Sequence, residues 1–364
     1  PLSSPYGRCS NVSKRYKKIS RIGEGTYGIV YKAIDQESDN QQIVALKRCL
    51  PHHEASDGFP ITTLREIQIL REISFDNRDG HENIVALKEV AVGSKRSSVF
   101  LVFEYVHFDL AQLIDRHYAK YSRSPFTIPQ TKCLANQLLS ALEYLHERCI
   151  IHRDLKLSNL LYDKDKGLLK LVDFGLARKM ESSVDQRNAH MINLPTTPHD
   201  NNLTPKVVSL WYRSPELLLN VESYTMAIDQ WAAGCVIAEL LFGKPFFHGK
   251  SELDQLAKIA DVLGPPNVRD WPELLDMPLV RAGTVNIPFA IRTNCDHDLR
   301  RGSHGKLLDL FSDLSTGGIE LFQYLFKYNP SDRWSAKTAH ECKWFREQPL
   351  PCQRNCMPKF DHKL

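Results

Sequence analysis

Short apolar runs and one longer periodic stretch organise the first hundred residues. Residues 30–34, 44–47 and 99–103 are short and rich in β-branched or aromatic side chains, which is typical of strands. Residues 60–73 instead carry apolar side chains at helical spacing and begin with proline, a residue favoured in the first helical turn. The pattern therefore predicts a small sheet accompanied by one helix.

Longer helical patterns dominate the rest of the 364-residue chain. Thr127 and Gln130 have the spacing of a capping box, and apolar positions recur at helical spacing over residues 134–145. Residues 224–242 are apolar on nearly every side, which indicates a helix buried at the centre of a domain. We expect an α+β protein with two lobes, preceded by a flexible polar tail at residues 1–15.

Composition narrows the class of protein. Hydrophobic residues make up 42% and charged residues 25%, and a net charge of +4 is too small to indicate nucleic-acid binding. The nine cysteines include no C-x-x-C pair, so we expect reduced thiols in an intracellular protein. The longest apolar stretch, residues 231–242, is too short for a membrane span and contains Glu239. We therefore expect no nucleic-acid partner and no membrane association.

The strongest chemical signal is the sequence HRDLKLSN at residues 152–159, followed by DFG at residues 173–175. It places Asp154, Lys156 and Asn159 on one short loop, with a second aspartate shortly after. Phosphoryl transfer needs such a set: a carboxylate to orient a hydroxyl, a cation for the migrating phosphate and oxygen ligands for Mg²⁺. An H-R-D tripeptide alone could be a charged turn, but the full pattern is far rarer by chance.

A glycine-rich segment near the N-terminus supports the same chemistry. Gly23, Gly25 and Gly28 follow a G-x-G-x-x-G pattern, which could open a dinucleotide-binding unit. A strand follows it here, where that unit would begin a helix, so two strands joined by a glycine-rich turn are the better interpretation. Lys47 lies in the next apolar strand, where it is either a surface lysine with a buried stem or a phosphate ligand.

Together these motifs resemble those of eukaryotic protein kinases, over about residues 16 to 360. The resemblance implies a bilobal kinase fold. A small β-rich N-lobe with one control helix covers residues 16–105, and a larger, mainly helical C-lobe covers residues 106–345. The activation segment spans residues 173–216 within the C-lobe, and residues 346–364 form a C-terminal tail.

The resemblance also implies a role for each motif residue. Catalytic roles fall to Asp154, Lys156, Lys47, Glu66 and Ser209, the last through a hydroxyl that could reach Asp154. Magnesium ligands are Asn159 and Asp173. The ATP site is expected to comprise Ile22, Gly23, Gly25, Gly28, Val30, Ala45, Lys47, Phe103, Glu104, Val106, Asp109 and Leu161.

The control helix indicates a partner protein. The heptad PITTLRE at residues 60–66 resembles the PITSLRE-type cyclin-binding helix of cyclin-dependent kinases. Glu66 shares one face with the apolar positions that follow it, whereas Ile61, Leu64 and Ile67 line another face. A helix that is apolar on two faces needs two burial partners. We expect a cyclin on the second face; a covering loop is the alternative.

The activation segment suggests control by phosphorylation. Residues 203–216, LTPKVVSLWYRSPE, resemble the corresponding segment of cyclin-dependent kinases and imply Thr204 as the site for an activating kinase. Its phosphate would be held by three arginines, Arg65, Arg153 and Arg178. The matching inhibitory sites would be Thr26 and Tyr27. We assign no structure to residues 182–202.

Two structural anchors are implied as well. Asp229 is expected to hold the catalytic loop, and Arg333 is expected to pair with Glu216 in an ion pair.

We therefore expect a cyclin-dependent serine/threonine kinase that transfers the γ-phosphoryl group of Mg-ATP to Ser/Thr-Pro sites of protein substrates. Its expected location is the nucleus, the cytoplasm or both, in cell-cycle or transcription control. One alternative is a cyclin-independent kinase of the mitogen-activated type, against which the absence of a T-x-Y pair before Pro205 argues. The other is a pseudokinase that acts as a binding module, although every residue required for the chemistry is present.

Overall fold

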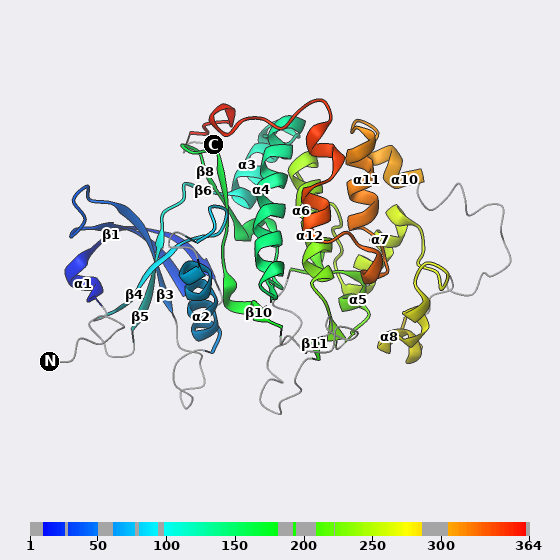
Figure 1. The fold of residues 1–364 in the computed structure, drawn as a ribbon, viewed down its shortest axis with the longest axis horizontal. Helices are drawn as coiled ribbons and strands as arrows, with labels where there is room; N and C mark the ends of the chain where they lie inside the picture. The colour runs from blue at the N-terminus through cyan, green and yellow to red at the C-terminus, as the bar shows by residue number, and fades with distance from the viewer. Residues whose placement is uncertain are drawn as a thin grey trace.

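An antiparallel five-stranded sheet forms the smaller lobe (Figure 1). The computed structural model describes residues 10–25, 28–49, 61–76, 80–93, 98–180, 192–193, 209–221, 223–285 and 305–361. The strands are β1 (Tyr16–Gly25), β2 (Gly28–Asp35), β3 (Ile43–Cys49), β4 (Leu87–Val92) and β5 (Val99–Glu104), in the spatial order β1-β2-β3-β5-β4. The helix α2 (Ile61–Asp76) lies beside this sheet and contacts β4.

Alternation along β3 explains how a lysine from an apolar strand reaches the interior between the lobes. Val44 and Leu46 are fully buried in the core of the small lobe. Successive side chains of a strand point to opposite faces, so Ala45 and Lys47 share the other face. The hydrophobic pattern of this strand therefore directs the Lys47 ammonium away from the core and toward the larger lobe.

The start of the chain corrects one expectation. Residues 10–15 are not a flexible tail, because α1 (Val12–Arg15) is capped by Asn11 and Val12 is buried against the sheet. Arg15 then pairs with Asp35 at 2.8 Å and with Glu89 at 3.1 Å. Residues 1–9, on which the rest of that expectation falls, lie outside the described part.

Helices are the main secondary structure of the larger lobe, as the sequence predicted. The helices are α3 (Leu110–Tyr121), α4 (Ile128–Glu147), α5 (Pro215–Leu218), α6 (Ala227–Phe242), α7 (Glu252–Leu263), α8 (Pro278–Arg281), α10 (Gly305–Leu310), α11 (Thr316–Leu325) and α12 (Ala336–His340). The predicted capping box forms at α4, where the Thr127 N–H donates to Gln130 Oε1 at 2.9 Å.

Short strands in the larger lobe lie next to the active-site loops. One three-stranded sheet has the order β6-β8-β9, from β6 (Phe108–Asp109), β8 (Leu160–Asp163) and β9 (Leu168–Leu171). Two further pairs join β7 (Ile150–Ile151) with β10 (Arg178–Lys179) and β11 (Ile192–Asn193) with β12 (Ser223–Tyr224).

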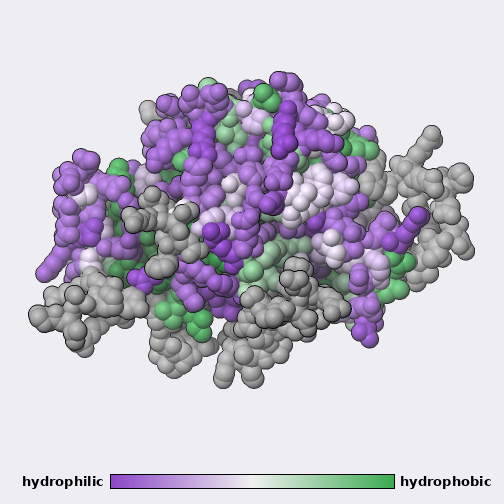
Figure 2. Space-filling view, in the orientation of Figure 1, coloured by the Kyte–Doolittle hydropathy of each residue, from purple (hydrophilic) through white to green (hydrophobic). Residues whose placement is uncertain are grey.

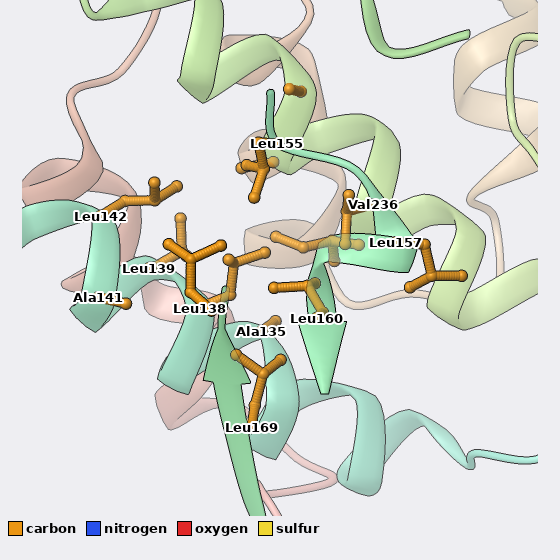
Figure 3. Close-up of a cluster of buried hydrophobic side chains, with 14 of the residues drawn as sticks. Ala135, Leu138, Leu139, Ala141, Leu142, Leu155, Leu157, Leu160, Leu169 and Val236 are labelled. Atoms are coloured by element: carbon orange, nitrogen blue, oxygen red, sulfur yellow. The ribbon is translucent and has the colours of Figure 1, made fainter. Parts of the chain in front are cut away.

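The core of the larger lobe lies between α4 and α6, and it includes residues of the catalytic loop (Figure 3). Leu155, Leu157 and Leu160 are buried among side chains such as Leu138 and Val236. The leucines thus hold the loop while the polar residues between them remain available for chemistry. No helix within the described ranges is long and apolar enough to cross a bilayer.

Candidate active site

Asp229, in the first turn of α6, anchors the catalytic loop, residues 152–159. Its Oδ2 accepts a hydrogen bond from the His152 N–H at 2.8 Å, and its Oδ1 accepts one from the Arg153 N–H at 2.9 Å. The His146 ring lies 3.1 Å from Oδ2. Burial alone would raise the pKa of Asp229, but these hydrogen bonds and nearby charges lower it, so the carboxylate is ionised. The predicted anchor is confirmed; His146 is a partner that the sequence analysis missed.

Asp154 lies at the centre of the loop and is 4% exposed. Its Oδ2 accepts hydrogen bonds from Lys156 Nζ at 2.7 Å and from Asn159 Nδ2 at 3.2 Å. Its Oδ1 is buried and has no hydrogen-bond partner within the described residues. Burial raises the pKa of Asp154, and Lys156 opposes the rise. The loop therefore holds one buried carboxylate oxygen, without a hydrogen-bond partner, beside a cation.

Ser209 corrects an expectation. Its hydroxyl was expected to reach Asp154, but no such hydrogen bond forms, and Oδ1 of Asp154 stays open. Ser209 instead precedes the 3₁₀ turn Leu210–Tyr212, and its carbonyl accepts a hydrogen bond from the Tyr212 N–H at 3.3 Å. The catalytic assignment of Ser209 therefore lacks a contact in this structure.

A second charged group joins the two lobes. Lys47 Nζ lies 2.9 and 2.8 Å from the two carboxylate oxygens of Glu66, and 3.1 Å from Asp173 Oδ1. Burial would lower the pKa of Lys47, but the two carboxylates raise it above its ordinary value, so the ammonium stays charged. For Asp173, burial would raise the pKa, but the positive charge of Lys47 lowers it. The carboxylate of Asp173 is therefore ionised.

Asp173 is connected to the catalytic loop through its neighbours. Phe174 is fully buried, and its ring meets the His152 ring edge-on at 5.0 Å. His152 Nε2 lies 3.1 Å from the carbonyl oxygen of Val172. Asp173 itself has φ of +66°, an uncommon conformation for a residue with a side chain. The packing on both sides holds that conformation and sets the carboxylate toward Lys47.

The nucleotide-binding residues expected from the small lobe lie on strands β1, β2, β3 and β5 of its sheet. Val30 pairs with Lys47, and Ala45 pairs with Phe103, across neighbouring strands. Ile22 is 41% exposed at the end of this surface. Gly23, Gly25 and Gly28 belong to the β1–β2 hairpin, and a Cβ at Gly28 would collide with the Arg48 carbonyl.

The remaining expected positions come from the end of β5, from the segment that follows it and from β8. The Glu104 carboxylate is held in place, because it accepts hydrogen bonds from Lys170 at 2.7 Å and from the Ala86 N–H at 2.9 Å. Val106 is buried, and Leu161 is half-buried in β8. Asp109 caps α3 by accepting from the Ala111 N–H at 2.8 Å, a role that the sequence analysis did not assign.

The three arginines expected to hold a phosphate lie around one side chain. Burial raises the pKa of Tyr224, and the positive charges of Arg153, Arg178 and Arg65 all oppose the rise. Arg153 also lies over the Tyr224 ring, 5.6 Å from its centroid. All three cations are thus close enough to Tyr224 to act on its hydroxyl. Thr204 falls outside the described residues, as do Thr26 and Tyr27.

The second face of α2 differs from the expectation at one position. Ile61 is 69% exposed and Leu64 is 52% exposed, and Figure 2 shows hydrophobic residues gathered at the lower end of α2. Ile67, however, is half-buried and packs against the main core. The exposed apolar surface of the helix is therefore smaller than the periodicity predicted.

A buried ion pair fixes the end of the activation segment. Arg333 donates to both carboxylate oxygens of Glu216 at 2.6 and 2.7 Å, as predicted. The same guanidinium also donates to the carbonyls of Ala227, Lys327 and Tyr328, so all five N–H groups of this buried cation have a hydrogen-bond acceptor.

Comparison with known proteins agrees with this geometry. A family model described as "Protein kinase domain" matches residues 16–345. The chain is 43% identical to Cyclin-dependent kinase 10 of Homo sapiens, over 100% of this chain and 88% of that protein. It is 41% identical to Probable cyclin-dependent kinase 10 of Dictyostelium discoideum, over 95% of this chain and 82% of that protein. It is 40% identical to Cyclin-dependent kinase G-2 of Oryza sativa subsp. japonica, over 99% of this chain and 46% of that protein.

The chain therefore belongs to the protein kinase family, and its bilobal fold is the one expected for that family. Within the family, its relatives place it among the cyclin-dependent serine/threonine kinases, as the sequence motifs predicted. ATP is accordingly a substrate.

Proposed function

We propose that the chain is a cyclin-activated kinase that transfers the γ-phosphoryl group of Mg-ATP to serine or threonine followed by proline. The observation that carries this proposal is the open Oδ1 of Asp154, buried beside Lys156 and Asn159. A buried acceptor without a partner costs free energy, which a donor from another molecule can recover. The hydroxyl of a serine or threonine substrate is such a donor.

Each charged group then has one task in the transfer. Asp154 accepts a hydrogen bond from the attacking hydroxyl and orients its oxygen toward the γ-phosphorus, while Lys156 contacts the γ-phosphate. Lys47 holds the α- and β-phosphates, and Glu66 keeps the ammonium in place. The new ester bond forms as the bond from the γ-phosphorus to the bridging oxygen breaks, so ADP leaves with that oxygen, and the proton of the hydroxyl passes to Asp154.

Asn159 and Asp173 fit a magnesium site by the chemistry of their donor atoms. Asn159 uses its Nδ2 to donate to Asp154, which leaves its amide oxygen as a ligand. Asp173 supplies an ionised carboxylate. Both are hard oxygen donors of the kind Mg²⁺ prefers. When bound, the ion neutralises charge on the phosphates during the transfer.

The adenine and ribose would occupy the space between the lobes. Ile22, Val30, Ala45 and Leu161 offer apolar surface to the two sides of a flat base, with Phe103 behind it. Backbone groups at Glu104 and Val106 meet the adenine edge, and Asp109 reaches the ribose hydroxyls.

Control would come from a partner and from phosphorylation. A cyclin packs on Ile61 and Leu64 and favours the position of α2 in which Glu66 meets Lys47. An activating kinase phosphorylates Thr204, whose phosphate recruits the arginines around Tyr224. Phosphate on Thr26 or Tyr27 inhibits, because it adds negative charge beside the phosphates of ATP.

Asp154→Asn in the purified cyclin complex tests the catalytic assignment. Turnover should fall by several orders of magnitude, because the substitution removes the carboxylate charge that meets the reacting hydroxyl and pairs with Lys156, while the affinity for ATP stays within about twofold. Asp309→Asn, at an exposed position of the larger lobe, is the matched control. A variant that kept even a third of the control's activity would show that Asp154 is not the catalytic carboxylate.

A further inference from the structure

The C-terminal tail, residues 346–361, returns across the larger lobe and ends beside β6 and β8 (Figure 1). It is attached at several points along its course. The Cys352 N–H donates to the Pro129 carbonyl at 2.9 Å, and Arg354 forms an ion pair with Glu82. The tail is therefore a bound part of the kinase domain over its described length.

Its last described residues enter an aromatic cluster. Phe360 is 9% exposed, and its ring meets those of Phe108, Phe126 and Tyr162 edge-on, with centroids 6.2, 5.6 and 6.1 Å away. The Tyr162 hydroxyl donates to the Pro358 carbonyl at 2.8 Å. Edge-to-face contacts with three rings fix the position of one side chain more tightly than burial alone does.

Two of these three rings belong to the strands that carry nucleotide-site residues. In the β6–β8 ladder, Phe108 pairs with Tyr162, and Asp109 pairs with Leu161. Neighbouring side chains of a strand point to opposite faces. The face of the ladder that packs on Phe360 is thus the reverse of the face that carries Asp109 and Leu161.

We propose that Phe360 is a positioning residue for ATP: it supports the β6–β8 ladder from behind and so sets Asp109 and Leu161 against the ribose and the base. This inference rests on the proposed roles of Asp109 and Leu161 in nucleotide binding. β6 is only two residues long, and its partner strand β8 is four residues long. A ladder this short depends on packing at its back for its position.

The test measures KM for ATP and kcat separately in the purified cyclin complex. Phe360→Ala should raise KM for ATP by roughly three- to tenfold and leave kcat within about twofold, because the catalytic loop is anchored elsewhere. A chain that ends at Met357 should behave in the same way, and Phe360→Leu should lie between it and the wild type. Lys359→Ala, at the exposed neighbouring position, is the matched control and should change neither constant.

A second substrate separates positioning from simple loss of stability. The wild type should prefer ATP to 2′,3′-dideoxy-ATP, which lacks the ribose hydroxyls, and both Asp109→Ala and Phe360→Ala should reduce that preference. If Asp109→Ala reduces it but Phe360→Ala only lowers the melting temperature, the inference about the tail is wrong while the nucleotide site stands. If Asp109→Ala leaves both KM and the preference unchanged, the proposed site and the inference fail together.

Discussion

The exposed apolar face of α2 makes a quantitative prediction about dependence on a cyclin. The perturbation is Leu64→Asp, which places a carboxylate in the middle of that face while leaving Glu66 free to meet Lys47. Leu64 is 52% exposed, so the folded kinase alone should tolerate the change. In the complex, the new carboxylate would be buried without a partner, which is strongly unfavourable.

The magnitude follows from the exposed fractions. Burying a whole leucine or isoleucine side chain contributes ~1.5–3 kcal/mol. Ile61 is 69% exposed and Leu64 is 52% exposed, so covering both would contribute about 2–4 kcal/mol, or roughly 30- to 700-fold in a two-state population. Because Ile67 already packs against the core, it adds little to this sum. A cyclin would need further contacts to convert a mostly inactive population into a mostly active one, which takes roughly 5 kcal/mol.

The assay compares cyclin affinity, kinase activity and melting temperature for the wild type, Leu64→Asp and Leu275→Asp. Leu275 is 50% exposed in the larger lobe, which makes it a matched control for adding a charge at an exposed leucine. Leu64→Asp should weaken cyclin binding by ~30-fold or more, a loss of about 2 kcal/mol, with an unchanged melting temperature. Cyclin affinity within twofold of the control, or full activity of the isolated wild-type chain, would refute partner control through this face.

Three further predictions concern phosphorylation, specificity and pH. Thr204→Ala should lower the activity of the cyclin complex without unfolding it, because no phosphate then binds the arginines around Tyr224. Full activity of this variant, together with mass spectrometry that finds Thr204 unmodified in the wild type, would contradict this. Peptide libraries should show a preference for proline directly after the phosphorylated residue, since any other residue would bury an unsatisfied N–H at a cost of about 1–3 kcal/mol; equal rates without proline would exclude that reason. Burial raises the pKa of Glu239 from 4.5 to about 7, with the Tyr212 hydroxyl opposing the rise, so the folded state keeps a proton that the unfolded chain releases. The free energy of unfolding should therefore fall by roughly 2–3 kcal/mol between about pH 5 and 8, and Glu239→Gln should remove this part of the dependence; identical pH profiles would show that Glu239 is ionised in the folded protein.

The catalytic loop could be predicted in detail because its residues are close together in sequence. Asp154, Lys156 and Asn159 lie within six positions, so the sequence alone indicates that their side chains are close together. The anchors Asp229 and Arg333 followed from resemblance, since nothing in their immediate sequence indicates the partners they find. Periodicity predicted the two faces of α2, and Ile67 lies at the boundary between them, where it is half-buried against the core.

Contacts between distant segments were the ones that the sequence did not indicate. Val12 reads as part of a polar tail until β1, β3 and β5 create a surface for it. Phe360 has no local pattern that predicts burial, because its neighbours Phe108, Phe126 and Tyr162 come from three separate segments. Such contacts depend on the assembled fold, and for Phe360 that assembly carries a functional consequence.

The catalytic loop and Lys47 are held by hydrogen bonds from different parts of the molecule. The hydrogen bonds that hold the catalytic loop come from within the larger lobe, from Val172 and from Asp229, whose carboxylate also contacts His146. Those of Lys47 come from α2 and from Asp173. If α2 moved away, as the proposed control requires, we expect Asp154 and Lys156 to keep their positions, while Lys47 would lose Glu66 and keep Asp173. Under that proposal, a partner that acts on α2 would govern how the phosphates are held rather than the loop that receives the hydroxyl.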